Sequence, residues 1–159
     1  MKKVKTKCGK LYIGPFPSEE DLISNGPFDI IWNLSYELAL FDEIVSLEKS
    51  HCANLLLGNI EDYSIPNDLQ LFNNQINYVV NCLKNQGKVF VHCVGGRGRT
   101  GMILSCLKSI IDDISPLSAI NFSKHECNGP EMTEQCNFVL DFMRDYNGPE
   151  IKPDKIYYK

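Results

Sequence analysis

The chain has 159 residues, 43% of them hydrophobic, which is the size of one domain with a full apolar core. Its formal net charge of −4 argues against general nucleic-acid binding, and no apolar run approaches the roughly 20 residues of a membrane-spanning helix. Seven cysteines, an odd number without a CxxC pair, argue against a disulfide scaffold and favour a reducing compartment, the cytoplasm.

Strand and helix signals alternate along the first half of the chain. The N-terminus carries four lysines in its first seven residues without the apolar stretch of a signal peptide, so it predicts a solvated tail. Ser18, followed by three acidic residues, is typical of a helix N-cap. Apolar runs predict strands at Lys10–Ile13, Asp29–Leu34 and Ala53–Leu57. Apolar residues at helical spacing predict helices at Leu38–Leu47 and from Asn67 to about Gln86.

The second half of the chain contains a strand, a glycine-rich turn and a helix in direct succession. Lys88–His92 predicts the strand and Thr100–Ile111 the helix, which is the context that a phosphate-binding loop needs. Ser115 and Pro116 then cap and begin another helix. The remaining segments are a break at Asn128–Pro130, a last helix at Glu131–Tyr146 and an irregular tail at about 148–159.

The alternation of strands and helices predicts the α/β class. We expect one domain over residues 1–159, built on a mostly parallel central sheet that helices cover on both faces. Ligands of such sheets bind at the carboxyl ends of the strands. The strand that ends at His92 delivers Cys93 to such an end.

Residues 91–101 carry the strongest functional signal. They read Val-His-Cys-Val-Gly-Gly-Arg-Gly-Arg-Thr-Gly, with a cysteine six residues before an arginine. A phosphate dianion needs converging N–H donors, which a tightly curled glycine-rich backbone and the planar guanidinium of Arg99 can supply. A helix that begins at about Arg99 also points its positive end into the loop and favours an ionised Cys93. We therefore expect phosphate to bind along Val94, Gly95, Gly96, Arg97, Gly98 and Arg99.

The motif His-Cys-x-x-Gly-x-x-Arg-Thr-Gly resembles the active-site CX5R loop of the cysteine-dependent protein tyrosine phosphatase superfamily. The resemblance implies that Cys93 attacks phosphorus, Arg99 holds the phosphoryl oxygens, and the hydroxyl of Thr100 assists the thiolate as leaving group. It also implies that His92 orients the loop. The length and the order of motifs are similar to the compact dual-specificity group, which includes the cyclin-dependent kinase-associated phosphatase and the small atypical dual-specificity enzymes.

Phosphoryl transfer to a thiolate also needs an acid that protonates the leaving oxygen. Asp62 lies 31 residues before Cys93, directly after a predicted strand, and small phosphatases of the superfamily place an Asp-bearing loop at about that distance. Glu61 and Asp68 are the alternative acids. The sequence therefore predicts that Asp62 lies at the same edge of the sheet as Cys93.

Two further residues carry alternative interpretations. By the resemblance Gln135 lies near the loop and positions water for hydrolysis of the phosphocysteine, whereas the alternative is simple helix capping. Arg97 adds a cation beside the site, which favours a second phosphate or an acidic peptide, unless this side chain only faces solvent.

We therefore predict a phosphatase that hydrolyses phosphotyrosine, and also phosphoserine or phosphothreonine, in proteins through a phosphocysteine intermediate. It needs neither metal nor cofactor, because the loop amides and Arg99 supply the positive field. We expect the chain to be a monomer whose partner is a phosphorylated protein. We expect it neither to bind nucleic acid nor to span a membrane. The alternatives are a phosphatase of phosphoinositides or RNA 5′-phosphates with the same loop, and a non-catalytic phosphoprotein-binding module.

Overall fold

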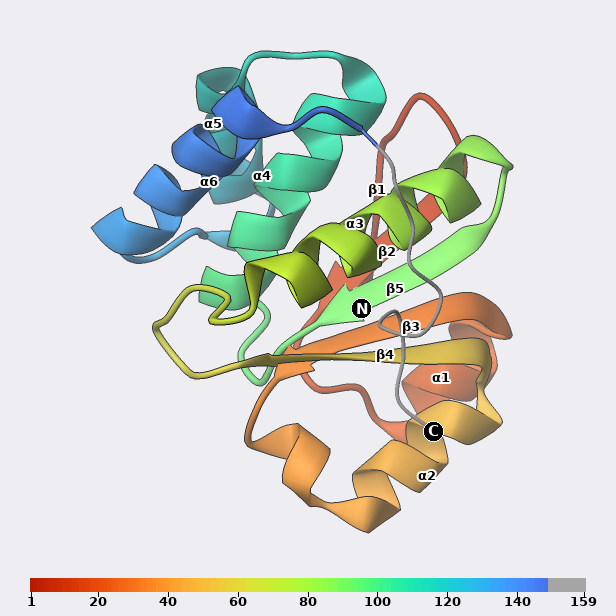
Figure 1. Cartoon of the computed structure of the whole chain (residues 1–159). Helices are drawn as coiled ribbons and strands as arrows, with labels where there is room; N and C mark the ends of the chain where they lie inside the picture. The colour runs from red at the N-terminus through yellow and green to blue at the C-terminus, as the bar shows by residue number, and fades with distance from the viewer. Residues whose placement is uncertain (149–159) are drawn as a thin grey trace.

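The computed structural model describes residues 1–148, so nearly all of the predicted irregular tail lies outside the described residues (Figure 1). A five-stranded sheet with the order β1-β2-β5-β3-β4 forms the centre. Strands β2, β5, β3 and β4 are parallel, and β1 pairs antiparallel with β2. The strands are β1 (Lys2–Val4), β2 (Lys10–Gly14), β3 (Phe28–Ser35), β4 (Cys52–Ile60) and β5 (Lys88–His92).

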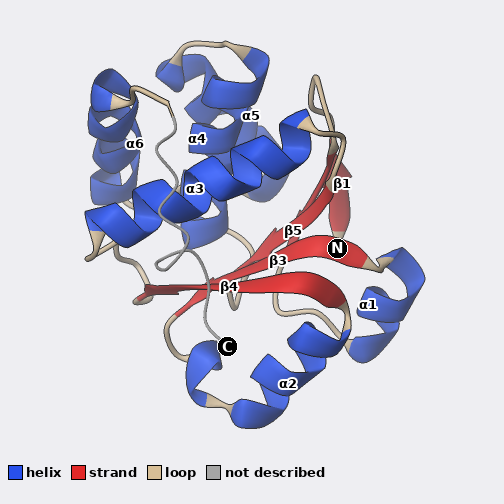
Figure 2. Ribbon diagram, turned by 45° about the vertical axis from the view of Figure 1, so that its right-hand side comes forward, coloured by secondary structure: helices blue, strands red, loops and turns tan. Residues whose placement is uncertain are grey.

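Helices cover both faces of this sheet, which confirms the predicted α/β class (Figure 2). On one side lie α1 (Glu19–Asn25) and α2 (Asp42–Ser50). On the other side lie α3 (Leu69–Lys84), α4 (Gly98–Asp112), α5 (Pro116–Cys127) and α6 (Thr133–Asp145). Within residues 1–148, no helix is long and apolar enough to cross a membrane.

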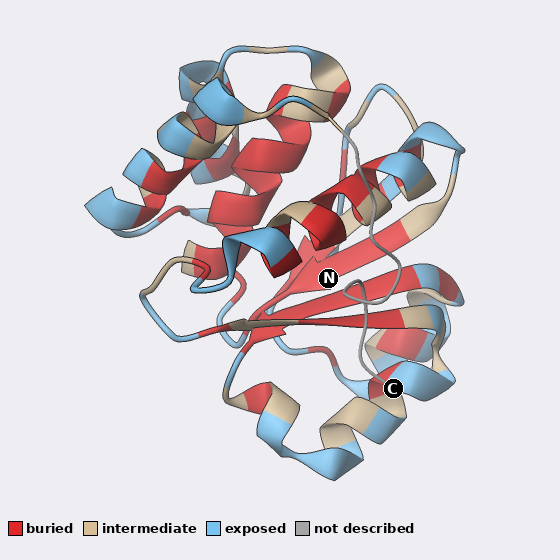
Figure 3. Ribbon diagram, in the orientation of Figure 1, coloured by how far each residue is buried: buried red, intermediate tan, exposed pale blue. Residues whose placement is uncertain are grey.

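Two apolar clusters separate these helices from the sheet, whose strands are largely buried in Figure 3. Trp32 of β3 is fully buried in the larger cluster, and its indole N–H donates to Gln75 of α3 at 3.0 Å. The neighbouring Ile31 points to the opposite face and packs in the smaller cluster with Leu22 of α1. Because side chains of a strand alternate between faces, β3 fills both clusters and must lie inside the sheet.

The N-terminal lysines correct the expectation of a solvated tail. Lys2–Val4 forms an edge strand on β2, with Val4 buried and with Lys2 and Lys3 exposed to solvent. The ammonium of Lys2 donates to the backbone oxygen of Glu126 at 3.2 Å and pairs with its carboxylate. The alternating pattern around one valine was too short to predict a strand, and pairing with β2 supplies the missing stabilisation.

Three helices begin later than the sequence predicts, and for the longest of them a side-chain N-cap sets the first residue. The segment predicted as one helix at 38–47 divides into a 3₁₀ turn, Leu38–Leu40, and α2. The long helix begins at Leu69 rather than Asn67, since the Asp68 carboxylate accepts from Leu71 N at 2.9 Å. The last helix begins at Thr133 rather than Glu131.

Candidate active site

Cys93 lies directly after β5 and below the first turn of α4, as the motif predicts. The side chain is buried, and its Sγ accepts hydrogen bonds from Gly96 N at 3.3 Å and from the Thr100 hydroxyl at 3.1 Å. Both donors stabilise negative charge on sulfur. Gly96 has φ 72°, and a Cβ atom there would lie 2.5 Å from the backbone of Gly14, so the tight curl of the loop requires glycine at this position.

Arg99 is buried in the first turn of α4, and its guanidinium contacts four oxygen atoms, which belong to Glu37, Ile60 and Asp62. Its Nη1 donates to Glu37 Oε2 at 2.7 Å and to the Ile60 carbonyl at 2.9 Å. Its Nη2 donates to Glu37 Oε1 at 2.8 Å and lies 3.2 Å from Asp62 Oδ1. The hydrogen bonds from Arg99 lower the pKa of Glu37 from 4.5 to about 2. The guanidinium is therefore held in a fixed plane by an ionised carboxylate.

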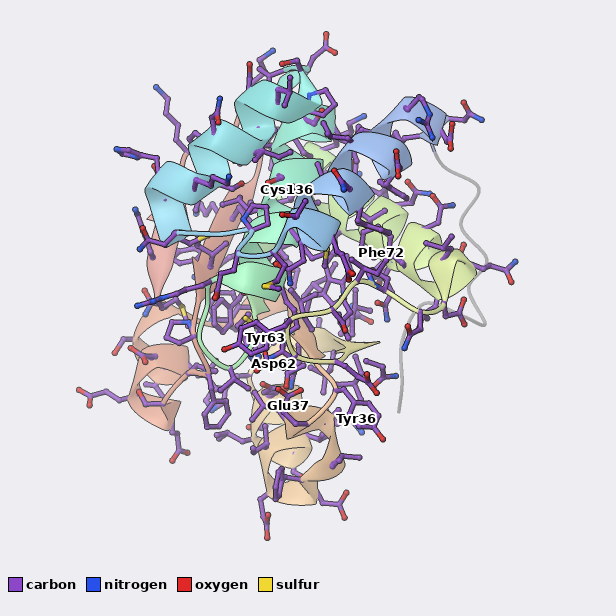
Figure 4. The ribbon with its side chains drawn as sticks, turned by 90° about the vertical axis from the view of Figure 1, so that its left-hand side faces the viewer. Tyr36, Glu37, Asp62, Tyr63, Phe72 and Cys136 are labelled. Atoms are coloured by element: carbon purple, nitrogen blue, oxygen red, sulfur yellow. The ribbon has the colours of Figure 1, made fainter. Side chains whose placement is uncertain are left out.

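Asp62 is the candidate acid that the fold brings to Arg99. It follows β4, its side chain is 58% exposed, and Oδ1 also accepts from Tyr63 N at 3.0 Å. Asp68 is committed to the N-cap of α3, and Glu61 is exposed, without a side-chain contact to Arg99 in the described part of the chain. Figure 4 shows Asp62 and Glu37 on neighbouring loops, where β4 and β3 end.

Gln135 lies against the loop but uses its amide on backbone groups. Its side-chain oxygen accepts from Glu131 N at 3.1 Å and Met132 N at 3.2 Å, and its NH2 donates to the Ser64 carbonyl at 3.2 Å. A Cβ atom on Gly98 would lie 3.2 Å from the same side-chain oxygen. These contacts match the helix-capping alternative, and they tie α6 to the segment that carries Asp62.

Of the other residues that the sequence singles out, His92 is buried, whereas Val94, Gly95 and Arg97 are exposed to solvent. His92 is fully buried, with Nδ1 3.2 Å from the Cys93 carbonyl oxygen and Nε2 2.6 Å from a Glu48 oxygen. Arg97 is exposed, and among residues 1–148 its guanidinium has no partner. It borders a pocket of about 220 Å³ that Gly95 and Gly96 also line. Val94 and Gly95 face solvent at the mouth of the loop.

Glu37 and Glu48 are the site residues that the sequence analysis misses. Glu37 follows the predicted strand at Asp29–Leu34 by three residues, which is the same kind of position that singled out Asp62. That positional rule, applied to every strand end, could have found it. Glu48 gives no such signal, because its place in an amphipathic helix predicts a solvent-facing carboxylate.

Comparisons with known proteins agree with the geometry of the loop. The family model described as "Polymorphic toxin system, DSP-PTPase phosphatase" matches residues 33–110. A protein of Invertebrate iridescent virus 6, named "Putative tyrosine phosphatase 197R", is 27% identical over 133 residues, which is 82% of this chain and 49% of that protein. Cyclin-dependent kinase inhibitor 3 of Rattus norvegicus is 37% identical over 65 residues, 38% of this chain and 30% of that protein. The chain thus spans about half the length of such relatives or less.

Solved structures share the fold over most of the chain. The active form of Tk-PTP superposes with a TM-score of 0.69 at 23% identity, and covers 87% of this chain and 93% of its own. A kinase-associated phosphatase with its catalytic cysteine replaced by serine gives a TM-score of 0.67 at 23% identity, with 85% of each chain covered. The arrangement of the sheet and six helices is therefore that of these small phosphatases.

Proposed function

We propose that this chain, which is similar to the cysteine-dependent protein tyrosine phosphatase superfamily and within it to the compact dual-specificity group, is a phosphatase of phosphorylated proteins. Its substrates are phosphotyrosine and, in the dual-specificity manner, phosphoserine or phosphothreonine. One observation carries the proposal: Asp62, 31 residues before Cys93 in the sequence, contacts Arg99 at the edge of the sheet where the loop from Cys93 to Arg99 lies. A nucleophile, an anion-binding arginine and an exposed carboxyl group are the minimum set for this chemistry.

In the first step the Cys93 thiolate attacks phosphorus in line and the bond to the ester oxygen breaks. Asp62, in its protonated form, gives its proton to that oxygen, which leaves as an alcohol or phenol. The loop amides and Arg99 hold the three equatorial oxygens. Arg99 Nη2 is engaged by Asp62 before substrate binds. An incoming phosphate that takes this donor releases the Asp62 carboxyl for proton transfer.

In the second step water attacks phosphorus and the S–P bond of the phosphocysteine breaks. Asp62, now ionised, takes a proton from the water, and inorganic phosphate is released. The Thr100 hydroxyl, 3.1 Å from Sγ, donates to the thiolate as it leaves. Gln135 lies close enough to the loop to restrict the water, although its own hydrogen bonds favour the capping role. No step in this scheme requires a metal or another cofactor.

Exposed tyrosines near the site support an aromatic phosphoester as substrate, and free cysteines support a reducing compartment. The tyrosines beside the two site carboxylates, Tyr36 and Tyr63, are 46% and 59% exposed and offer aromatic surface at the mouth (Figure 4). Such surface suits an aromatic phosphoester in an extended protein segment. All seven cysteines are free thiols, which fits a reducing compartment such as the cytoplasm. We propose a monomer that acts on one phosphoprotein at a time.

The unpaired guanidinium of Arg97 favours a second candidate function. A cation next to the phosphate loop would bind a second anionic group, as in a phosphoinositide or an RNA 5′-phosphate. PTPMT1, solved in complex with PI(5)P, has a TM-score of 0.65 at 14% identity, which shows a shared fold alone. We rank this function second because Arg97 lies outside the set formed by Cys93, Arg99 and Asp62.

Substrate profiling of the purified chain tests the proposal. Phosphotyrosine peptides, phosphoserine and phosphothreonine peptides, phosphoinositides and triphosphorylated RNA are compared, with Cys93→Ser as the blank. We expect the largest kcat/KM on phosphotyrosine peptides. Turnover of lipid or RNA substrates alone would move the second function ahead. Tight peptide binding without turnover by the wild-type chain would identify a phosphoprotein-binding module instead.

A further inference from the structure

A pocket of about 710 Å³, which we call the α6 pocket, lies between α6 and the start of α3. Its floor is aromatic, because Phe138, Phe142 and Tyr146 recur at every fourth position along one face of α6 and its C-cap. The centroid of the Phe142 ring lies 5.7 Å from that of Phe138, 5.6 Å from that of Tyr146 and 4.9 Å from that of Phe72 on α3 (Figure 4). The Tyr146 hydroxyl donates to Asn77 Oδ1 at 2.6 Å. These contacts fix the rings before anything binds to them.

The rim of the α6 pocket is acidic. Glu134, Asp141 and Asp145 line it, and no lysine, arginine or histidine among residues 1–148 does. Arg144 lies 3.4 Å from both Asp141 and Asp145, so three carboxylates stand against one guanidinium and leave a net charge of −2. Carboxylates above aromatic rings are complementary to a lysine or arginine, whose methylene stem packs on the rings while its charged end meets the carboxylates.

The α6 pocket begins where the segment that carries Asp62 ends. Ile65, three residues after Asp62, lines the pocket, and the Gln135 NH2 holds this segment on α6 by donating to the Ser64 carbonyl at 3.2 Å. Asp62 itself lies 3.2 Å from Arg99. Three extended residues span about 10 Å. A peptide whose phosphate lies in the loop therefore reaches the pocket within about four residues.

An exposed apolar side chain completes the edge of the α6 pocket on the α3 side. Leu69, the first residue of α3, lines the pocket and is 59% exposed. Exposed apolar surface beside a preformed pocket is typical of a site that another protein covers. The pocket thus offers apolar contact and negative charge together, next to the phosphate loop.

We propose that the α6 pocket docks the phosphoprotein substrate by binding a lysine or arginine side chain near the phosphorylated residue, while Leu69 contacts an apolar side chain beside it. This inference rests on the proposed function and narrows its substrates to phosphosites with a basic and an apolar residue nearby. The stretch of α6 from Glu134 to Tyr146 is about 18 Å long, which about five extended residues match. The basic residue therefore lies about four to eight residues from the phosphotyrosine.

Peptide kinetics test the charge of the rim. Two phosphotyrosine peptides are compared that differ only in lysine or glutamine about six residues from the phosphotyrosine, after it in one pair and before it in another. In one pair we expect the lysine peptide to have an about fivefold lower KM with an unchanged kcat, because docking stabilises substrate and transition state alike. The preference should shrink as salt is raised to about 0.5 M.

Asp141→Asn should remove the preference for lysine by removing a rim carboxylate. Asp113→Asn is the matched control, because it makes the same change at the exposed C-cap of α4, a left-handed position that asparagine tolerates, at the end of this helix away from the loop. We expect the control to keep the preference. Equal KM values for the lysine and glutamine peptides of both pairs, or a preference that Asp141→Asn retains, would overturn the docking role of the pocket.

Leu69→Gln tests the apolar edge, with Leu117→Gln near the start of α5 as its control. Both leucines are exposed, at 59% and 64%, so both variants should unfold at about the wild-type temperature. We expect Leu69→Gln to raise KM for the lysine peptide about threefold, without a change in kcat, and Leu117→Gln to leave KM unchanged. Equal KM values for the two variants would remove Leu69 from the docking surface.

The failure of this inference and the failure of the proposed function give different results. Turnover of the phosphotyrosine peptides without any preference for lysine would overturn the docking role and leave the proposed function intact. If none of the peptides is turned over, the proposed function is wrong, and isothermal titration decides the pocket alone. A preference for lysine that Asp141→Asn removes then supports it, and equal affinities overturn it. A dimer in sedimentation equilibrium that Asp141→Asn dissociates would identify a second copy of the chain as the occupant instead.

Discussion

The two halves of the proposed phosphate site are built in different ways. The loop half, Cys93 to Arg99, is one continuous segment, and its two reactive side chains are 3% and 2% exposed. The acid half consists of Glu37 and Asp62, which come from two separate strand ends and are 39% and 58% exposed. Burial and backbone hydrogen bonds make the loop half rigid, whereas the exposed carboxylates can exchange partners when substrate binds.

Cys93→Ser removes the reactive atom of the rigid half and should have the largest effect. We expect kcat to fall by more than about 10⁴-fold, because a hydroxyl is far less ionised than a thiol, while phosphopeptide affinity is retained. Steady-state kinetics and isothermal titration measure the two quantities. Cys136→Ser, a half-buried thiol on α6, is the control. Turnover near the wild-type level would place the nucleophile elsewhere.

Asp62→Asn tests the exposed half. A general acid contributes about 10²- to 10⁴-fold when the leaving group is basic and much less when it leaves easily. We therefore expect a large loss of kcat on tyrosyl and alkyl phosphates and a small loss on an activated aryl phosphate, with a flattened basic limb in the pH profile. If Glu61→Gln or Asp68→Asn shows this dependence on the leaving group instead, the assignment moves to that residue.

Arg99→Lys tests the side chain of the loop half that contacts both carboxylates of the acid half. A lysine ammonium cannot reproduce the planar contacts with Glu37 and the phosphate, so we expect kcat/KM to fall by about 10²- to 10³-fold. The loss should be similar for basic and activated leaving groups, unlike that of Asp62→Asn. Arg144→Lys, on an exposed arginine of α6, serves as the control. Normal kinetics for Arg99→Lys would show that phosphate binds elsewhere.

Glu37→Gln should give the smallest effect, on the pH dependence of stability. Arg99 lowers the pKa of Glu37 from 4.5 to about 2, so the ionised group stabilises the folded chain above about pH 4.5, and this stabilisation is lost as the pH falls toward about 2. The unfolding temperatures of wild type and variant should therefore differ near neutral pH and converge in acid. Because the side chain is 39% exposed, the difference is modest. Equal unfolding temperatures of wild type and variant at every pH would contradict the stabilising role of the ionised Glu37 carboxylate.

Most of the fold could be predicted from the sequence, because its signals are local. The apolar run at Asp29–Leu34 and the turn after His92 correspond to β3 and to the loop before α4. The predictions failed where a cap or a neighbouring strand decides the outcome. Asp68 sets the start of α3, and β2 turns three N-terminal residues into a strand.

The sequence by itself determined the half of the site that is continuous in the chain. The spacing from Cys93 to Arg99 and the glycines between them define the curled loop, since backbone conformation there depends on adjacent residues. Only the tertiary structure placed Glu37 on Arg99 and buried Glu48 behind His92. Those contacts depend on the order in which parallel strands pair, so no local pattern encodes them. Asp62 lies between these two cases: its position after a strand end was predictable, and its contact with Arg99 was not.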